Sequence, residues 1–256
     1  MAWLKFQNIS SKTISDLWVP SKHSDPYWRI YWNRDLGAKV FFDDQVISLL
    51  PEYIYILPAW MIWKGELENP VEHTWANFRT HQWNKAVCRN WFPRPVQISL
   101  DSPRGACMLE IFERFRKEKE LPEVEGEALA HLALGETMNT FPMPSSSNPL
   151  LHKVLSYIQE HLDGDLRVAN LAKVQGCSAG HLSRLFQEQL GASPSQVVRE
   201  SRISFAADRL LESHESMEHI AEASGFSNRF HFSRVFREVM HMAPAAFRKH
   251  HWGSWS

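Results

Sequence analysis

Two stretches of the C-terminal half decide the fold: LAKVQGCSAGHLSRLFQEQLGASP at 171–194 and IAEASGFSNRFHFSRVFREVMHMAP at 220–244. With one residue inserted in the second stretch, they match at apolar, small, glycine, serine, arginine and proline positions. The matched pairs are Leu171 with Ile220, Ala172 with Ala221, Gly176 with Gly225, Ser178 with Ser227, Arg184 with Arg234, Phe186 with Phe236 and Pro194 with Pro244. One structural unit is therefore used twice.

Each unit has the pattern of a helix, a tight turn and a second helix. Gly176 and Gly225 can take the positive φ that ends a helix. Ser178 and Ser227 follow as predicted N-caps of the second helix, because a serine hydroxyl accepts from the backbone N–H groups of a first turn. This layout predicts two helix-turn-helix units.

Helical periodicity divides the second helix of each unit into an apolar and an outward face. An outward face of small, Ser, Gln and Arg side chains suits the major groove, where arginine pairs with guanine. A polar face that only keeps the surface hydrated is the alternative, and the repeated arginine favours DNA. Phe230 stays open between a thymine-methyl contact and packing. The DNA-binding candidates are Gly180, Ser183, Arg184, Gln187, Arg229, Phe230, Ser233, Arg234 and Arg237.

The stretch PSQVVRESRISFAADRLLES at 194–213 predicts one long helix that connects the two units. A rigid connector would fix the spacing of the two recognition helices. We expect a separation of about 34 Å, one turn of the duplex, if both helices enter the same face.

Residues 150–250 resemble the DNA-binding domain of the AraC/XylS family of bacterial transcription regulators. The resemblance is carried by GCSAGHLSRLFQEQLGASP, RISFAADRLL and IAEASGFSNRFHFSRVFREVMHMAPAAFR. It implies base contacts from 180, 183 and 184 in the first unit, and from 229, 230, 233 and 234 in the second. Two positions depart from the family pattern: His241 stands where glycine is usual, and Gly180 replaces a larger side chain. The first unit is therefore expected to read fewer bases.

Charge gives little general attraction to nucleic acid. The whole chain has 28 Lys and Arg against 29 Asp and Glu, and residues 150–256 have 12 against 11. Binding to double-stranded promoter DNA must then depend on a few placed arginines and on helix N-termini. We expect a homodimer to supply affinity, and RNA polymerase to be a partner if the protein is an activator.

The N-terminal half is rich in short aromatic and β-branched runs separated by turn residues. These runs predict strands at 29–32, 38–42, 45–50, 53–57 and 96–100 and a small barrel or sandwich. The family resemblance implies a cupin-like barrel that binds a small-molecule effector. The expected fold is α+β in two domains, a cupin-like β-barrel with a helical pair followed by an all-α domain with two helix-turn-helix units.

Tryptophan is concentrated before residue 92, where nine of the eleven indoles lie. Indole faces stack on sugars and on flat ligands, so a carbohydrate is the leading effector hypothesis. The alternative for any one tryptophan is a place in the core. The ligand-binding candidates are Trp28, Arg29, Trp32, Trp60, Trp63, Trp75, Arg79 and His81.

Two helices are predicted after the strands, at 102–121 and 126–138, the first capped by Ser102 with Pro103 at its first position. They either form a dimer interface, as the resemblance implies, or pack on their own barrel. Three prolines and a Ser/Asn cluster predict a linker at 139–149. The expected domains are 1–138 for effector binding and dimerisation and 150–256 for DNA binding.

Other function classes lack a motif. No two of the four N-terminal histidines are closely spaced, so neither a metal site nor a cofactor is expected, and a cupin-type metal enzyme is the weaker alternative. A helical protein-interaction module without DNA binding is the other alternative. Three dispersed cysteines, no leader pattern and no long apolar run predict a cytoplasmic protein without a membrane partner.

Overall fold

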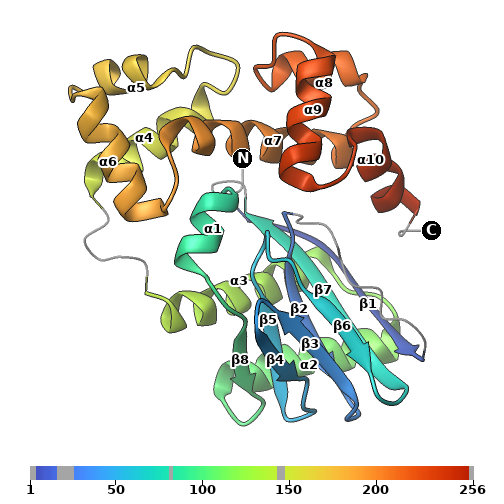
Figure 1. Cartoon of the computed structure of the whole chain (residues 1–256). Coiled ribbons are helices and arrows are strands. Elements are labelled where there is room, and N and C mark those ends of the chain that lie inside the picture. Colours follow the sequence, from blue (N-terminus) through green and yellow to red (C-terminus); the bar gives the residue numbers. More distant parts are fainter. Residues whose placement is uncertain (1–3, 16–25, 81–82, 143–147, 254–256) are drawn as a thin grey trace. The chain divides into compact units, whose positions relative to one another are not determined.

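The computed structural model describes residues 4–15, 26–80, 83–142 and 148–253 (Figure 1). The chain forms two compact units: residues 1–80 with 92–142, and residues 81–91 with 143–256. Strands dominate the first unit, whereas the second is all helical. The α+β class is therefore confirmed. Residues 83–91, expected in the effector domain, pack instead with the helix-turn-helix unit.

The N-terminal unit contains two antiparallel sheets. Five strands form the larger sheet in the order β1-β7-β2-β5-β8, and three form the smaller in the order β4-β3-β6. The strands are β1 (Leu4–Ile14), β2 (Trp28–Asn33), β3 (Ala38–Phe42), β4 (Gln45–Ser48), β5 (Tyr53–Leu57), β6 (Lys64–Leu67), β7 (Val71–Thr80) and β8 (Val96–Ser99). All five predicted strands are confirmed, and β1, β6 and β7 are additional.

One apolar cluster joins the two sheets. Tyr31, Tyr55 and Leu57 enter it from the larger sheet, and Val40 and Phe42 enter it from the smaller. Because side chains alternate across a strand, the same strands present a second face to the helices. The larger sheet is therefore buried on both faces, one against the small sheet and one against helices.

Two helices cover that second face. Helix α2 (Pro103–Glu118) packs on β5 and β8, and α3 (Glu123–Thr140) packs on β1, β8 and α2. Ser102 caps α2 by accepting from Gly105 N at 3.0 Å, and Pro103 takes the first position, as predicted. Both helices thus pack on their own sheet. Helix α3 extends two residues into the expected linker, and residues 143–147 of that linker lie outside the described residues.

The helical unit is built around α7 (Pro194–Glu212), the predicted connector, which contacts helices on both sides of it (Figure 1). Its apolar face is buried, as expected from the helical period. The other helices of this unit are α1 (Lys85–Trp91), α4 (Pro149–Glu160), α5 (Val168–Val174), α6 (Ala179–Leu190), α8 (Met217–Ala223), α9 (Arg229–Met240) and α10 (Pro244–Gly253). No helix in the described part of the chain is both long and apolar enough to cross a membrane.

Candidate nucleic-acid interface

The two turns that precede the recognition helices have the same geometry. Gly176 and Gly225 have φ of +67° and +74°. Cys177 N donates to Ala172 O at 3.0 Å, and the equivalent bond joins the residue after Gly225 to Ala221 O at 2.9 Å. This pattern is a Schellman motif, in which a left-handed residue satisfies the last carbonyls of a helix. The repeat in the sequence is therefore a repeat in the backbone.

The helix starts differ between the units. Ser178 caps α6 and accepts from His181 N at 3.1 Å, as predicted. The prediction that Ser227 caps α9 is wrong: Asn228 is the cap, and its Oδ1 accepts from His231 N at 2.9 Å. The reason is the residue inserted in the second unit, which lengthens the turn and moves the helix start by one position.

The buried faces of α6 and α9 follow the apolar periodicity. Leu182 and Phe186 of α6 are fully buried, as are Phe232 and Phe236 of α9. Phe232 and Phe236 pack edge to face with ring centroids 5.5 Å apart, and Phe236 packs in the same way on Phe247 of α10. Each recognition helix is thus held by one face, which leaves the opposite face to solvent.

That opposite face carries all nine DNA-binding candidates. Ser183 and Ser233 are half-buried, and the other seven are exposed. Phe230 is 80% exposed, so it is not part of the packing, and the Arg229 guanidinium lies 5.9 Å from its ring centroid. An exposed phenylalanine at the first turn of a recognition helix is free to contact a thymine methyl group. Contact of these residues with bases stays a prediction.

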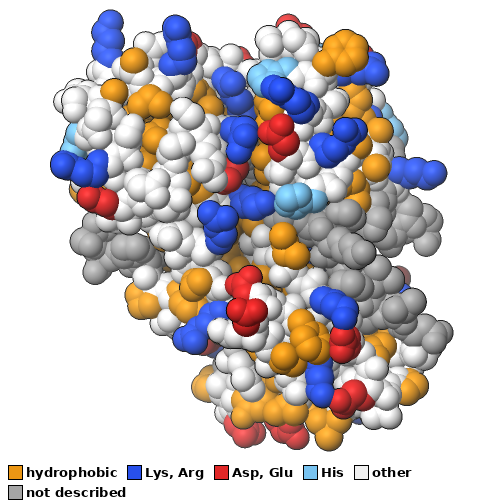
Figure 2. Space-filling model, in the orientation of Figure 1, with side chains coloured by type: hydrophobic (Ala, Val, Ile, Leu, Met, Phe, Trp, Pro, Cys, Tyr) orange, Lys and Arg blue, Asp and Glu red, His pale blue; other side chains and the backbone are white. Residues whose placement is uncertain are grey.

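The arginines of this surface differ in their ion pairs. Arg229 donates to Glu218 Oε1 at 2.6 Å, and this bond lowers the pKa of the Glu218 carboxyl. Arg184 has only a 4.0 Å approach to Glu188. Within the described residues, no ion pair is recorded for Arg234 or Arg237. Figure 2 shows Lys and Arg side chains gathered on the visible face of this unit with fewer acidic ones among them.

Sequence reasoning missed three exposed residues at the helix starts. His181 and His231 occupy matched positions in the first turns of α6 and α9, and Asn228 precedes α9. The signal was present, because the repeat aligns the two histidines. An imidazole there can bond to a phosphate or a base edge.

Arg202 of α7 links the loop before α5 to the turn at Gly225. Its Nε and Nη2 donate to the carbonyls of Leu162 and Gly164, each at 2.8 Å. Gly225 lies directly on this contact, since a Cβ there would be 2.2 Å from Leu162 O and 2.8 Å from the Arg202 guanidinium carbon. The second turn therefore needs glycine for space as well as for its φ.

The ligand-binding candidates of the N-terminal unit do not converge. Register places Trp28 and Trp32 on the helix-facing side of the large sheet, where Trp28 stacks on Phe78 and Trp32 on Phe112 of α2. Their indole N–H groups donate to Thr80 Oγ1 and Pro51 O. These two indoles belong to the packing between sheet and helices.

Other candidates lie on the opposite side of the sheet, toward the core cluster. The Arg29 guanidinium is 5.8 Å from the Trp63 ring centroid, and Lys12 Nζ is 5.6 Å from that of Trp75. Buried Arg79 is 5.9 Å from the Tyr27 ring, and buried Trp60 takes a left-handed φ of 67° after β5. His81 lies outside the described residues.

A buried histidine completes this inner face. His73 Nδ1 lies 2.6 Å from Asn33 Oδ1, and because an amide oxygen only accepts, Nδ1 carries the proton. Its ring stacks on Trp75 with centroids 5.3 Å apart. Burial, with a smaller contribution from the charge of Lys12, lowers the pKa of His73 to about 3. His73 is therefore neutral at physiological pH.

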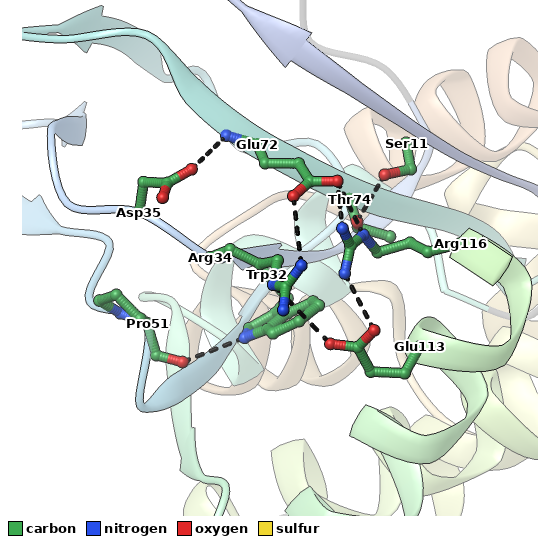
Figure 3. Close-up of polar contacts among 9 residues, drawn as sticks. All are labelled: Ser11, Trp32, Arg34, Asp35, Pro51, Glu72, Thr74, Glu113 and Arg116. Carbon is green, nitrogen blue, oxygen red and sulfur yellow. Dashed lines mark hydrogen bonds and ion pairs between the residues drawn. The ribbon is translucent and has the colours of Figure 1, made fainter.

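A charged cluster fastens α2 to the sheet (Figure 3). Arg116 of α2 pairs with Glu72 of β7 and with Glu113, and its guanidinium lies 5.7 Å from the Trp32 ring centroid. Arg34 pairs with the same two carboxylates at 3.6 and 3.9 Å. An open groove of about 620 Å³ adjoins the cluster, and both positive and negative side chains line it. The cluster is structural, because its charges compensate one another.

No group of three His, Cys, Asp or Glu side chains that could hold a metal ion occurs among the residues that the structure describes.

Comparison with known proteins agrees with this geometry. A profile described as a helix-turn-helix domain matches residues 171–250. YfiF of Bacillus subtilis, described as an uncharacterized helix-turn-helix transcriptional regulator, is 37% identical over 103 residues, which are 40% of this chain and 32% of YfiF. The multiple antibiotic resistance protein MarA of Escherichia coli is 29% identical over 98 residues, 38% of this chain and 77% of MarA. The chain thus spans about a third of one relative and three quarters of the other.

Among solved structures, ToxT of Vibrio cholerae superposes with a TM-score of 0.62 at 14% identity, covering 96% of this chain and 97% of ToxT. This likeness extends the shared fold to the N-terminal unit. Two helix-turn-helix units joined by one connector helix define a DNA-binding domain of transcription regulators. The comparisons support the resemblance of the C-terminal unit to the DNA-binding domain of AraC-type regulators.

Proposed function

We propose that the protein binds promoter DNA through α6 and α9, with Arg184 and Arg234 as the principal base-reading residues. The observation that carries this is the repeated outward face: the two arginines occupy matched positions and both are exposed. Arginine in the major groove donates two hydrogen bonds to guanine O6 and N7. The N-termini of the same helices favour phosphate contacts, which compensates for the small net charge of the unit.

The test is equilibrium binding of the full chain to a duplex that it has selected from a random library. Arg234→Ala should cost about 1–3 kcal/mol of specific binding, because one bidentate base contact is lost. Binding to unrelated duplex, measured at the same salt concentration, is the internal control and should change much less. Unchanged specific binding in both Arg234→Ala and Arg184→Ala would favour the protein-interaction module.

A small-molecule effector bound by the N-terminal unit is the second part of the proposal. Two cation–ring pairs on the inner face support it: Arg29 with Trp63, and Lys12 with Trp75. The half-buried indole of Trp75 could stack on a sugar, which remains one class to test. The cations favour a carboxylate with an apolar body, and one ToxT structure is described as bound to an unsaturated fatty acid.

Thermal-shift measurements on the full chain separate the two classes. A ligand that binds only the folded state raises its melting temperature with concentration. Neutral sugars should be compared with long-chain carboxylates and their uncharged alcohols. Stabilisation by carboxylates alone, lost in Lys12→Met, supports the cationic site. No shift with either class contradicts the effector proposal.

The remaining partners follow from the proposed role. A homodimer would double the DNA contacts, and the exposed part of α2 and α3 offers a surface for it. Sedimentation equilibrium of the full chain tests this. The protein would act in the cytoplasm and contact RNA polymerase if it activates transcription.

A further inference from the structure

Helix α1 is a short segment of the N-terminal half that docks on the DNA-binding unit. It contacts α6 and α7, and Ala86, Val87 and Cys88 form its buried side. Asn84 begins it: Oδ1 accepts from Val87 N at 3.1 Å, while Nδ2 donates to Ser201 Oγ of α7 at 2.9 Å. One side chain thus caps α1 and fastens it to the connector.

Two further bonds reach the C-terminal turns of both recognition helices. Asn90 Nδ2 donates to Gln189 O of α6 at 2.6 Å, and Lys85 Nζ donates to Val239 O of α9 at 3.1 Å. The carbonyls at the end of a helix carry partial negative charge, which an ammonium group complements. Burial lowers the pKa of Lys85, and Glu200 of α7 opposes that shift. The three polar residues of α1 therefore touch α6, α7 and α9 together.

These contacts leave the recognition faces open. The ties are made to backbone carbonyls in the last turns of α6 and α9, and the base-contact candidates stay exposed or half-buried, including Gln187 and Arg237 of those turns. A segment that held the helices across their outward faces would compete with DNA. A segment that holds their ends instead fixes their orientation on α7.

We propose that Asn84, Lys85 and Asn90 are positioning residues for DNA recognition, a role that rests on the proposed function. They hold α6 and α9 in one relative orientation, so a duplex with both subsites is bound without a further ordering cost. The segment is continuous with β7 at one end and with Phe92 at the other, and Phe92 packs on Trp28 of the N-terminal unit at 5.1 Å. The N-terminal unit is therefore linked to both recognition helices through α1.

The test uses the full chain with Lys85→Met combined with Asn90→Ala, which removes the ties to α9 and to α6 and adds no bulk. Amide exchange measured by mass spectrometry should become faster at the last turns of α6 and α9. Affinity for a selected duplex with both subsites should fall about threefold to tenfold, the order of one or two net hydrogen bonds. A duplex with a single subsite should lose less than about twofold, because one helix needs no partner orientation.

Two matched variants control the experiment. Arg89→Ala changes an exposed residue of the same helix and should leave exchange and affinity as in the wild type. Lys85→Arg keeps a cationic donor and should restore most of the affinity that Lys85→Met alone removes.

Three results would overturn the inference: unchanged exchange at the ends of α6 and α9, unchanged affinity for the two-subsite duplex, or equal weakening on both duplexes. If the double variant does not fold, Lys85→Met alone is judged by exchange at the end of α9 and by the same two affinity criteria. A wild-type chain that selects no sequence at all contradicts the proposed function instead, and the exchange measurement still decides whether α1 holds the two helices.

Discussion

Glycine serves two different physical needs in the two turns of the repeat. Both turns need a left-handed residue, which costs about 1–2 kcal/mol for a side chain other than glycine. At Gly176 a Cβ would meet nothing within 4 Å, whereas at Gly225 it would meet a backbone carbonyl and the Arg202 guanidinium. Two glycine positions that align in sequence therefore differ in how well they tolerate a larger side chain.

We predict that Gly176→Ala lowers the free energy of unfolding by about 1–2 kcal/mol, from backbone strain alone. Gly225→Ala should cost about 3 kcal/mol or more, because the Arg202 bonds to Leu162 and Gly164 must also shift. Urea unfolding followed by circular dichroism at 222 nm reports the helical unit. Equal losses of unfolding free energy in the two variants would contradict the close approach of Gly225 to Leu162 O and Arg202.

The lowered pKa of His73 predicts that the stability of the N-terminal unit depends on pH. Its pKa of about 3 in the folded state lies below the unfolded value of about 6.5, so between these values the unfolded chain binds a proton that the folded chain does not. The free energy of unfolding should fall as pH drops through this window, by about 1.4 kcal/mol per pH unit near its middle. His73→Gln should remove this part of the slope.

Tryptophan fluorescence is the appropriate probe for His73, since most indoles lie in the N-terminal half. The difference between wild type and His73→Gln isolates the histidine from carboxylates that titrate in the same range. His131→Gln, an exposed site on α3, is the control and should keep the wild-type slope. A wild-type slope in His73→Gln would show that His73 is protonated in the folded unit.

At the scale of the element, the corrected start of α9 can be tested directly. Asn228→Ala removes the cap bond to His231 N and should cost about 1 kcal/mol of stability. Ser227→Ala should change stability by less than about 0.5 kcal/mol, because that hydroxyl caps nothing. The same urea experiment measures both. The opposite order of effects would restore Ser227 as the cap.

Elements with a regular apolar period could be predicted from the sequence. The connector α7 and both recognition helices have such a period, and so do the aromatic strands β3 and β5. Strand β7 was missed because polar residues such as Glu72, Asn77 and Arg79 interrupt its pattern. Their partners come from distant segments: Glu72 pairs with Arg116, and Asn77 bonds to Asn8.

The same distinction applies to the candidate sites. The outward face of α6 and α9 follows from helical geometry within twelve residues, so local sequence determines it. A pocket in a sheet depends on register between strands far apart in the chain. Register separates Trp28 and Trp32 from Trp63 and Trp75, and composition alone does not reveal that separation.

At the scale of the whole molecule, the chain passes between the two units three times: before α1, after α1 and after α3. A single linker at 139–149 would leave the units free to act separately. The additional passages at 80–81 and 91–92 connect the proposed effector-binding unit covalently to helix α1, which contacts the recognition helices. The two units are therefore connected by three segments of the chain, and not only by the linker that the sequence predicts.

The central claim is that both recognition helices read bases. Selection of duplexes from a random library by the wild type, Arg184→Ala and Arg234→Ala tests it most directly. The wild type should select a motif with two conserved parts about 10 base pairs apart, and each variant should lose preference in a different part. Variants that both select the complete wild-type motif would contradict the account.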